Sequence, residues 1–88
     1  MQKTALITGA NRGLGAALTS NFRQAGWRVL GTARNPSAIA SETAHAKHAL
    51  DLSQIDSVHA LSSAVVDAGE TIDLLINNAG FNPKDRKD

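Results

Sequence analysis

One segment constrains this chain more than any other, because a glycine-rich run joins a strand-like apolar segment to a stretch with helical periodicity. The run is Thr8-Gly9-Ala10-Asn11-Arg12-Gly13-Leu14-Gly15, and it directly follows Ala5-Leu6-Ile7. Such a turn directs backbone N–H groups and the positive end of a helix dipole at one point, which favours a bound phosphate. We expect Gly9 to make the tight turn, Gly13 to let a pyrophosphate approach, and Gly15 to let the helix pack closely. The spacing is G-x-x-x-G-x-G rather than G-x-G-x-x-G, so an ordinary strand-to-helix turn is an equally good interpretation of the run alone.

The hydrophobic pattern along the rest of the chain predicts four short strands that alternate with helices. The strands are expected at residues 3–8, 27–33, 47–52 and 72–77. Strands that alternate with helices are typical of a parallel sheet with right-handed crossovers. The sequence therefore predicts an α/β fold in a single domain.

The first helix is expected over residues 13–25, with Gly26 at its left-handed end. Its apolar residues recur at helical spacing and predict one buried stripe, made of Leu14, Leu18 and Phe22 with Ala17 and Ala25 on the same side.

Two further helix starts can be predicted from local signals. Asn35 followed by Pro36 is typical of an N-cap and a first helical position, and predicts a short helix over residues 36–43. Ser53 and Asp56 have the spacing of a capping box and predict a helix that ends near Gly69. The apolar face of this last helix is expected to contain Ile55, Val58, Leu61 and Val65.

Composition excludes several classes of function. The chain has 88 residues, which suit one small domain, and a formal net charge of +1, which argues against nucleic-acid or membrane-surface binding by bulk charge. It has no cysteine, which removes disulfide and thiol chemistry and fits a cytoplasmic protein. No apolar stretch has the length of a signal peptide or a membrane span, so neither is expected.

Three motifs together resemble the short-chain dehydrogenase/reductase family. They are the T-G-x-x-x-G-x-G run, the pair Asp51-Leu52 after the third strand, and Asn77-Asn78-Ala79-Gly80 after the fourth. They occur in that family's order, and the resemblance covers residues 3 to 80. It implies a Rossmann-like doubly wound sheet with strand order 3-2-1-4, flanking helices, and a nicotinamide dinucleotide at the switch point between strands one and four.

The resemblance also implies which residues bind the cofactor. Asp51 would accept a hydrogen bond from the adenine amino group, although an acid that only favours the start of the next helix is the alternative. Asn78, Ala79 and Gly80 would pass close to the adenosine ribose, whereas for Asn77 a structural role is the stronger interpretation. The full set of expected cofactor-binding residues is Gly9, Asn11, Arg12, Gly13, Leu14, Gly15, Arg34, Asp51, Leu52, Asn78, Ala79 and Gly80.

The end of the second strand predicts a preference for NADP over NAD. Relatives that prefer NAD have an acidic side chain there for the ribose hydroxyls, but this chain has Ala33 followed by Arg34. A guanidinium can bind a 2′-phosphate through paired charge-assisted hydrogen bonds, and Arg12 could reach the same phosphate. The alternative is that both arginines are simply exposed.

The family's catalytic tyrosine has no counterpart, because the chain contains no tyrosine. We therefore expect no catalytic residue in this chain, no turnover by it alone, and a small carbonyl or alcohol as the substrate only of a longer parent. His45, His48 and His59 are expected to be surface residues rather than metal ligands. Residues 1–80 would form the dinucleotide-binding domain, and 81–88 a charged loop or tail.

Two alternatives to the cofactor-binding part of an oxidoreductase remain open. The missing tyrosine also fits a non-catalytic dinucleotide-binding module. The apolar segment 72–76 would be an open sheet edge, which favours a self-associating fragment or a homo-oligomer.

Overall fold

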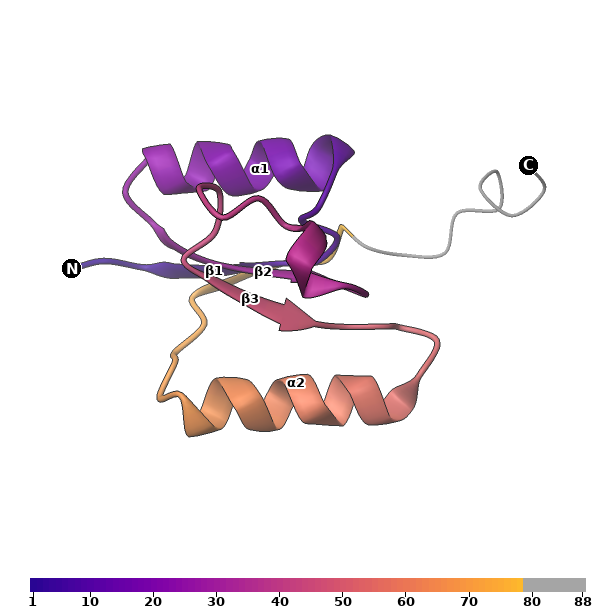
Figure 1. Ribbon diagram of the computed structural model, residues 1–88. Coiled ribbons are helices and arrows are strands. Elements are labelled where there is room, and N and C mark those ends of the chain that lie inside the picture. The colour runs from indigo at the N-terminus through magenta and orange to yellow at the C-terminus, as the bar shows by residue number, and fades with distance from the viewer. Residues whose placement is uncertain (79–88) are drawn as a thin grey trace.

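A computed structural model describes residues 1–78 and contains one parallel four-stranded sheet with a helix on each face (Figure 1). The strands are hydrogen-bonded in the order β3-β2-β1-β4, which confirms the predicted fold class and strand order. Their bounds are β1 (Thr4–Ile7), β2 (Arg28–Ala33), β3 (Ala46–Ala49) and β4 (Leu74–Ile76). Each is shorter than predicted. The expectations for Ala79, Gly80 and residues 81–88 lie outside the described residues.

The central strand β1 is buried along its whole length and pairs with β2 and β4. Leu6 lies opposite Leu30 of β2 on one side and opposite Leu75 of β4 on the other. The side chains of Leu6 and Leu30 are buried, but that of Leu75 is 59% exposed. Among the described residues, β4 is therefore an edge strand with an apolar side chain in contact with water.

Helix α1 (Gly13–Gln24) covers the face of the sheet that holds the main core. The predicted stripe is confirmed only at Leu18 and Phe22, which pack against the core. Leu14 is 67% exposed, Ala17 and Ala25 are exposed as well, and the buried residues of the helix are Gly15 and Thr19. The hydroxyl of Thr19 donates to the carbonyl of Gly15 at 2.7 Å, so this polar side chain is satisfied within its own helix. The core under α1 consists of Ile7, Ala10, Val29, Ala33, Ile39 and Ala44, with Leu18, Phe22, Trp27 and Ile76 packed against it.

The predicted helix over 36–43 is only the 3₁₀ turn η1 (Pro36–Ala38). Its start was predicted correctly, because Pro36 follows Asn35, whose side chain accepts a hydrogen bond from the Ser37 N–H at 3.2 Å. The turn stops because Ile39 is extended and its side chain is buried in the core over Gly31. Burial of one large apolar side chain thus outweighs further helix formation here.

Helix α2 (Ile55–Asp67) covers the opposite face of the sheet (Figure 1). Unlike α1, it has no fully buried residue, and Ile55 of the predicted apolar face is exposed. The predicted capping box is also wrong. The N-cap is Gln54, and Ser53 bonds to Asp51 instead of to the helix.

Two polar contacts connect the elements at the edge where β2 begins. The guanidinium of Arg28 forms a bidentate ion pair with the carboxylate of Glu70, with a shortest N···O distance of 2.6 Å. The Nδ1 atom of His45 accepts a hydrogen bond from the buried backbone N–H of Val29 at 2.9 Å. This histidine side chain therefore extends the pairing of β3 with β2 by one hydrogen bond.

Candidate functional site

The glycine run forms the connection from β1 to α1 at the carboxyl edge of the sheet. Gly9 and Gly13 have φ angles of 66° and 60°, a region that side chains disfavour, so the prediction that Gly9 makes the turn is confirmed. A Cβ at Gly15 would collide with the carbonyl oxygen of Gly9. The close approach of α1 to the end of β1 therefore requires glycine at position 15, as the sequence predicted.

The amino end of α1 is exposed and has no capping side chain from its N-cap residue. Its N-cap is Arg12, whose side chain makes no capping hydrogen bond, and the first turn contains no acidic residue. A Cβ at Gly13 would have no atom within 4 Å, so the space outside this turn is open. Unpaired N–H groups and the positive helix end make this position suitable for an anion.

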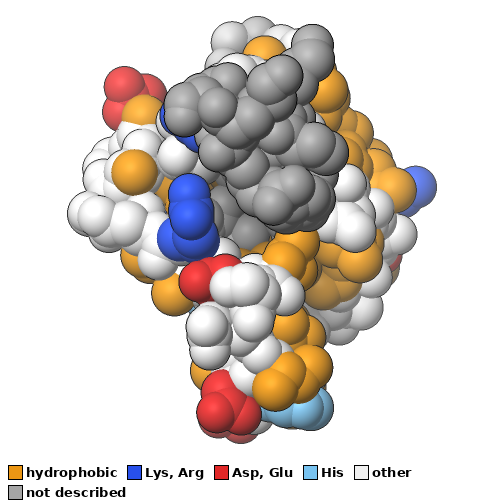
Figure 2. Space-filling view, turned by 90° about the vertical axis from the view of Figure 1, so that its right-hand side faces the viewer, with side chains coloured by type: hydrophobic (Ala, Val, Ile, Leu, Met, Phe, Trp, Pro, Cys, Tyr) orange, Lys and Arg blue, Asp and Glu red, His pale blue; other side chains and the backbone are white. Residues whose placement is uncertain are grey.

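Two charged residues lie where neighbouring strands end, Arg34 directly after β2 and Asp51 shortly after β3. Hydrogen bonds from the side chain and the backbone of Ser53 hold the pKa of Asp51 below its usual value, and the charge of Arg34 lowers it further. Asp51 is therefore a carboxylate near neutral pH. Figure 2 looks at this edge, and basic side chains lie on it beside an acidic one.

The segment after β4 is tied to the glycine run. The side-chain amide of Asn78 donates to the carbonyl of Gly9 at 3.3 Å. The Thr8 hydroxyl donates to Oδ1 of Asn77 at 3.2 Å, which supports the structural interpretation of Asn77. The structure thus brings most of the predicted residues to one edge of the sheet, namely Gly9, Asn11, Arg12, Gly13, Leu14, Gly15, Arg34, Asp51, Leu52 and Asn78.

The carboxylate of Asp51 lies in the turn that leads into α2 and does not cap the helix directly. Its Oδ1 atom accepts hydrogen bonds from the backbone and the hydroxyl of Ser53, at 3.0 and 2.6 Å, before the helix begins. The Asp51 N–H donates to the hydroxyl of Ser57 on α2 at 2.8 Å. Sequence reasoning assigned Ser53 to a capping box and missed its bond to Asp51, although an aspartate two residues before a serine is a known signal for such a turn. It did not identify Ser57.

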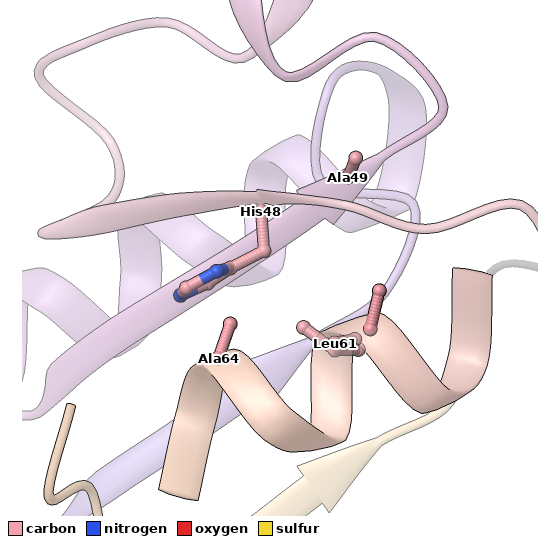
Figure 3. Close-up of a pocket in the computed structure, with 5 residues that line it drawn as sticks. His48, Ala49, Leu61 and Ala64 are labelled. Atoms are coloured by element: carbon pink, nitrogen blue, oxygen red, sulfur yellow. The ribbon is translucent and has the colours of Figure 1, made fainter. Parts of the chain in front are cut away.

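A cavity lies between the end of β3 and α2. Figure 3 shows the imidazole of His48 between β3 and α2, on the side of Ala64, and Leu61 of α2 also lines the cavity. The remaining residues that line the cavity are the alanines Ala49 and Ala60, so His48 supplies its one polar side chain. Within residues 1–78, no group of three or more His, Cys, Asp or Glu side chains could hold a metal ion, and no helix has the length and hydrophobicity of a membrane span.

The same sequence is similar to known oxidoreductases. A family model described as short chain dehydrogenase matches residues 3–88. A serine 3-dehydrogenase from Agrobacterium fabrum is 40% identical over 86 residues, which cover 92% of this chain and 34% of that protein. A short-chain dehydrogenase/reductase from Pestalotiopsis microspora is 42% identical over 82 residues, which cover 90% and 29%. This chain therefore spans about a third of the length of these relatives.

Among solved structures, a metagenomic short-chain oxidoreductase in complex with NADP is 36% identical, with a TM-score of 0.75. The match covers 90% of this chain and 39% of that one.

Proposed function

Because this chain belongs to the short-chain dehydrogenase family, we propose that it binds NADP at the carboxyl edge of its sheet, as the cofactor-binding part of an oxidoreductase. Residues 1–80 would be the binding domain, with 81–88 as a charged extension. When bound, NADP supplies or accepts a hydride, and the parent enzyme would interconvert a small carbonyl compound and an alcohol in the cytoplasm. NAD is the less favoured cofactor.

One observation carries the proposal. The amino end of α1 is exposed, uncapped and free of acidic side chains, and it is reached through a turn with open space at Gly13. A pyrophosphate fits these properties because it brings charge and acceptor oxygens, whereas an apolar ligand would leave the N–H groups unpaired. Leu14 and Asn11 belong to the same turn, and their backbone would face the ligand.

The preference for NADP depends on the end of β2. Ala33 leaves no carboxylate there to repel a 2′-phosphate, and Arg34 follows it with an exposed side chain. Arg12 is a second exposed guanidinium at the same edge. The 2′-phosphate would lie between these two charges, with the adenine on the Asp51 side and the ribose near Asn78.

The proposal is tested by titrating the chain with NADPH and NADH in a calorimeter. Arg34→Ala is expected to cost roughly 1.5–3 kcal/mol toward NADPH and little toward NADH. Arg23→Ala is the matched control, because it removes an exposed arginine in the last turn of α1, away from the site. Equal affinities for the two cofactors in the unsubstituted chain would contradict the preference.

A second pair of variants tests the pyrophosphate position. Gly13 and Gly26 both have positive φ and no neighbour that a Cβ would meet. Gly13→Val and Gly26→Val should therefore destabilise the fold similarly, but only Gly13→Val should abolish binding of NADPH. Retained affinity in Gly13→Val would mean that the glycine run is only a turn.

Absence of tyrosine supports the further expectation that this chain alone has no turnover. The same observation favours the alternative of a non-catalytic dinucleotide-binding module. Measurement of NADPH oxidation with a panel of carbonyl compounds tests the expectation for the chain itself, and the same assay on a longer parent distinguishes an enzyme from a non-catalytic module. Consumption above a buffer control that is lost in Gly13→Val would contradict the expectation.

The other alternative, self-association into a homo-oligomer, is favoured by the exposed Leu75 and Leu74 on the edge strand β4. Pairing with a second copy would satisfy the free backbone groups of this edge. No interaction with nucleic acid or membrane is proposed.

A further inference from the structure

Four hydrogen bonds hold Asp51 in the loop between β3 and α2. Its N–H donates to the Ser57 hydroxyl at 2.8 Å, and its carbonyl accepts from the Gln54 N–H at 2.9 Å. Its Oδ1 atom accepts from both the N–H and the hydroxyl of Ser53. The backbone of Asp51 and one of its two carboxylate oxygens are therefore fixed.

The other carboxylate oxygen, Oδ2, receives no hydrogen bond from residues 1–78. A carboxylate is an acceptor with two oxygens, so Oδ2 keeps its full capacity for a donor from outside the chain. Ser53 restricts rotation of the carboxylate about its bond to Cβ, which determines the direction of Oδ2. An acceptor oriented in this way is suited to an exocyclic amino group, and not to a carbonyl.

Ser57 has a different part in this arrangement. It is the third residue of α2 and is half-buried. Its own N–H donates to the carbonyl of Gln54, as is usual at the start of a helix. Its hydroxyl reaches back beyond the helix to the backbone of Asp51. Ser57 therefore couples the position of Asp51 to the rigid helix instead of leaving it to the loop.

We propose that Ser57 is a positioning residue for recognition of adenine, and that it holds Asp51 where Oδ2 accepts a hydrogen bond from the adenine amino group. Ser53 contributes by fixing the rotation of the same carboxylate. The inference rests on the proposed function, because it requires the dinucleotide to bind with its adenine beside Asp51. The inference adds that Ser57 and Ser53 make the site selective for adenine over a base that has a carbonyl in place of the amino group.

The test compares NADPH with its hypoxanthine analogue, in which a carbonyl oxygen replaces the amino group. The dissociation constant of the analogue divided by that of NADPH measures recognition of the amino group. General damage to the site would weaken binding of both ligands and leave this ratio unchanged. Ser57→Ala should reduce the ratio roughly threefold to tenfold by weakening NADPH more than the analogue. Ser57→Thr, which keeps the hydroxyl, should restore it.

Ser62→Ala is the matched control, because Ser62 is exposed on the same helix. Ser53→Ala is a second variant that leaves α2 intact, and it should lower the ratio as well. An unchanged ratio in Ser57→Ala and Ser53→Ala, with NADPH still bound, would overturn this inference alone. Failure of the unsubstituted chain to bind either dinucleotide would overturn the proposed function and the inference with it.

Discussion

Replacement of Gly15 by alanine should destabilise the fold, although alanine is the better helix former. The new Cβ would collide with the carbonyl oxygen of Gly9 and lie 2.7 Å from Nδ2 of Asn78. The first of these atoms belongs to the backbone and cannot rotate away, so the helix or the turn has to move.

The magnitude follows from three contributions. Overpacking costs about 1–3 kcal/mol, and a rigid backbone neighbour places this site at the upper end. The hydrogen bond between Asn78 and Gly9 would be lost with the movement, at roughly 0.5–1.5 kcal/mol. Helix propensity returns about 1 kcal/mol. We expect a net loss of about 2–3 kcal/mol, a large part of the roughly 4–13 kcal/mol available to a domain of this size.

The chain supplies its own probe for the measurement. Trp27 is the only tryptophan, and it packs edge-to-face on Phe22 of α1 with ring centroids 5.1 Å apart. Its fluorescence should therefore report separation of α1 from the sheet during unfolding in urea. Gly26→Ala is the comparison, because its new Cβ meets no neighbour, and its cost comes from the positive φ of Gly26, which Gly15 does not share. A Gly15→Ala variant at least as stable as Gly26→Ala would refute the packing argument.

Three further outcomes are expected. Burial and the charges of Arg23 and Arg28 lower the pKa of His45, so the folded state favours its neutral form. The contribution of His45 to the free energy of unfolding should therefore be complete above pH 6.5 and fall as the pH drops below 6.5. His45→Ala should flatten this pH dependence in urea titrations. The hydrogen bond to Arg28 lowers the pKa of Glu70, so Glu70→Gln should cost about 1 kcal/mol or less at pH 7. The cost should shrink as acid protonates Glu70 in the wild-type fold, and a cost that stays constant down to acid unfolding would contradict the ion pair as its cause. If the β4 edge self-associates, Leu75→Lys should lower the apparent mass that light scattering measures at high protein concentration. An unsubstituted chain that stays a monomer at every concentration would contradict self-association.

The parts of the fold that were predictable from sequence depend on local signals. Gly9, Gly15 and Gly26 were assigned correctly because a positive φ or a close backbone approach restricts those positions to glycine. Strand order followed from the resemblance to a family, and not from the pattern of apolar residues. The candidate residues at the ends of β1, β2 and β3 could be expected at one edge because parallel strands bring their carboxyl ends together.

The errors occur where tertiary packing overrides local preference. Residues 36–43 have a good helix start, but Ile39 gains more from burial than the helix would. Leu14 fits an apolar stripe by spacing, yet the close approach at Gly15 rotates Thr19 into the interface and leaves Leu14 outside. Ser57 could not be identified in advance, because its contact with Asp51 depends on the exact path of a loop.

The unequal packing of the two helices has a consequence for motion. Helix α1 closes over the main core, whereas α2 buries no residue fully, so α2 has less apolar area to lose when it detaches. Amide hydrogens of α2 should therefore exchange with solvent through local opening well before those of β1 and β2. Because Ser57 joins the Asp51 loop to α2, each such opening would release Asp51 while the glycine turn keeps its shape. The base of a bound nucleotide would then detach and rebind faster than its phosphates.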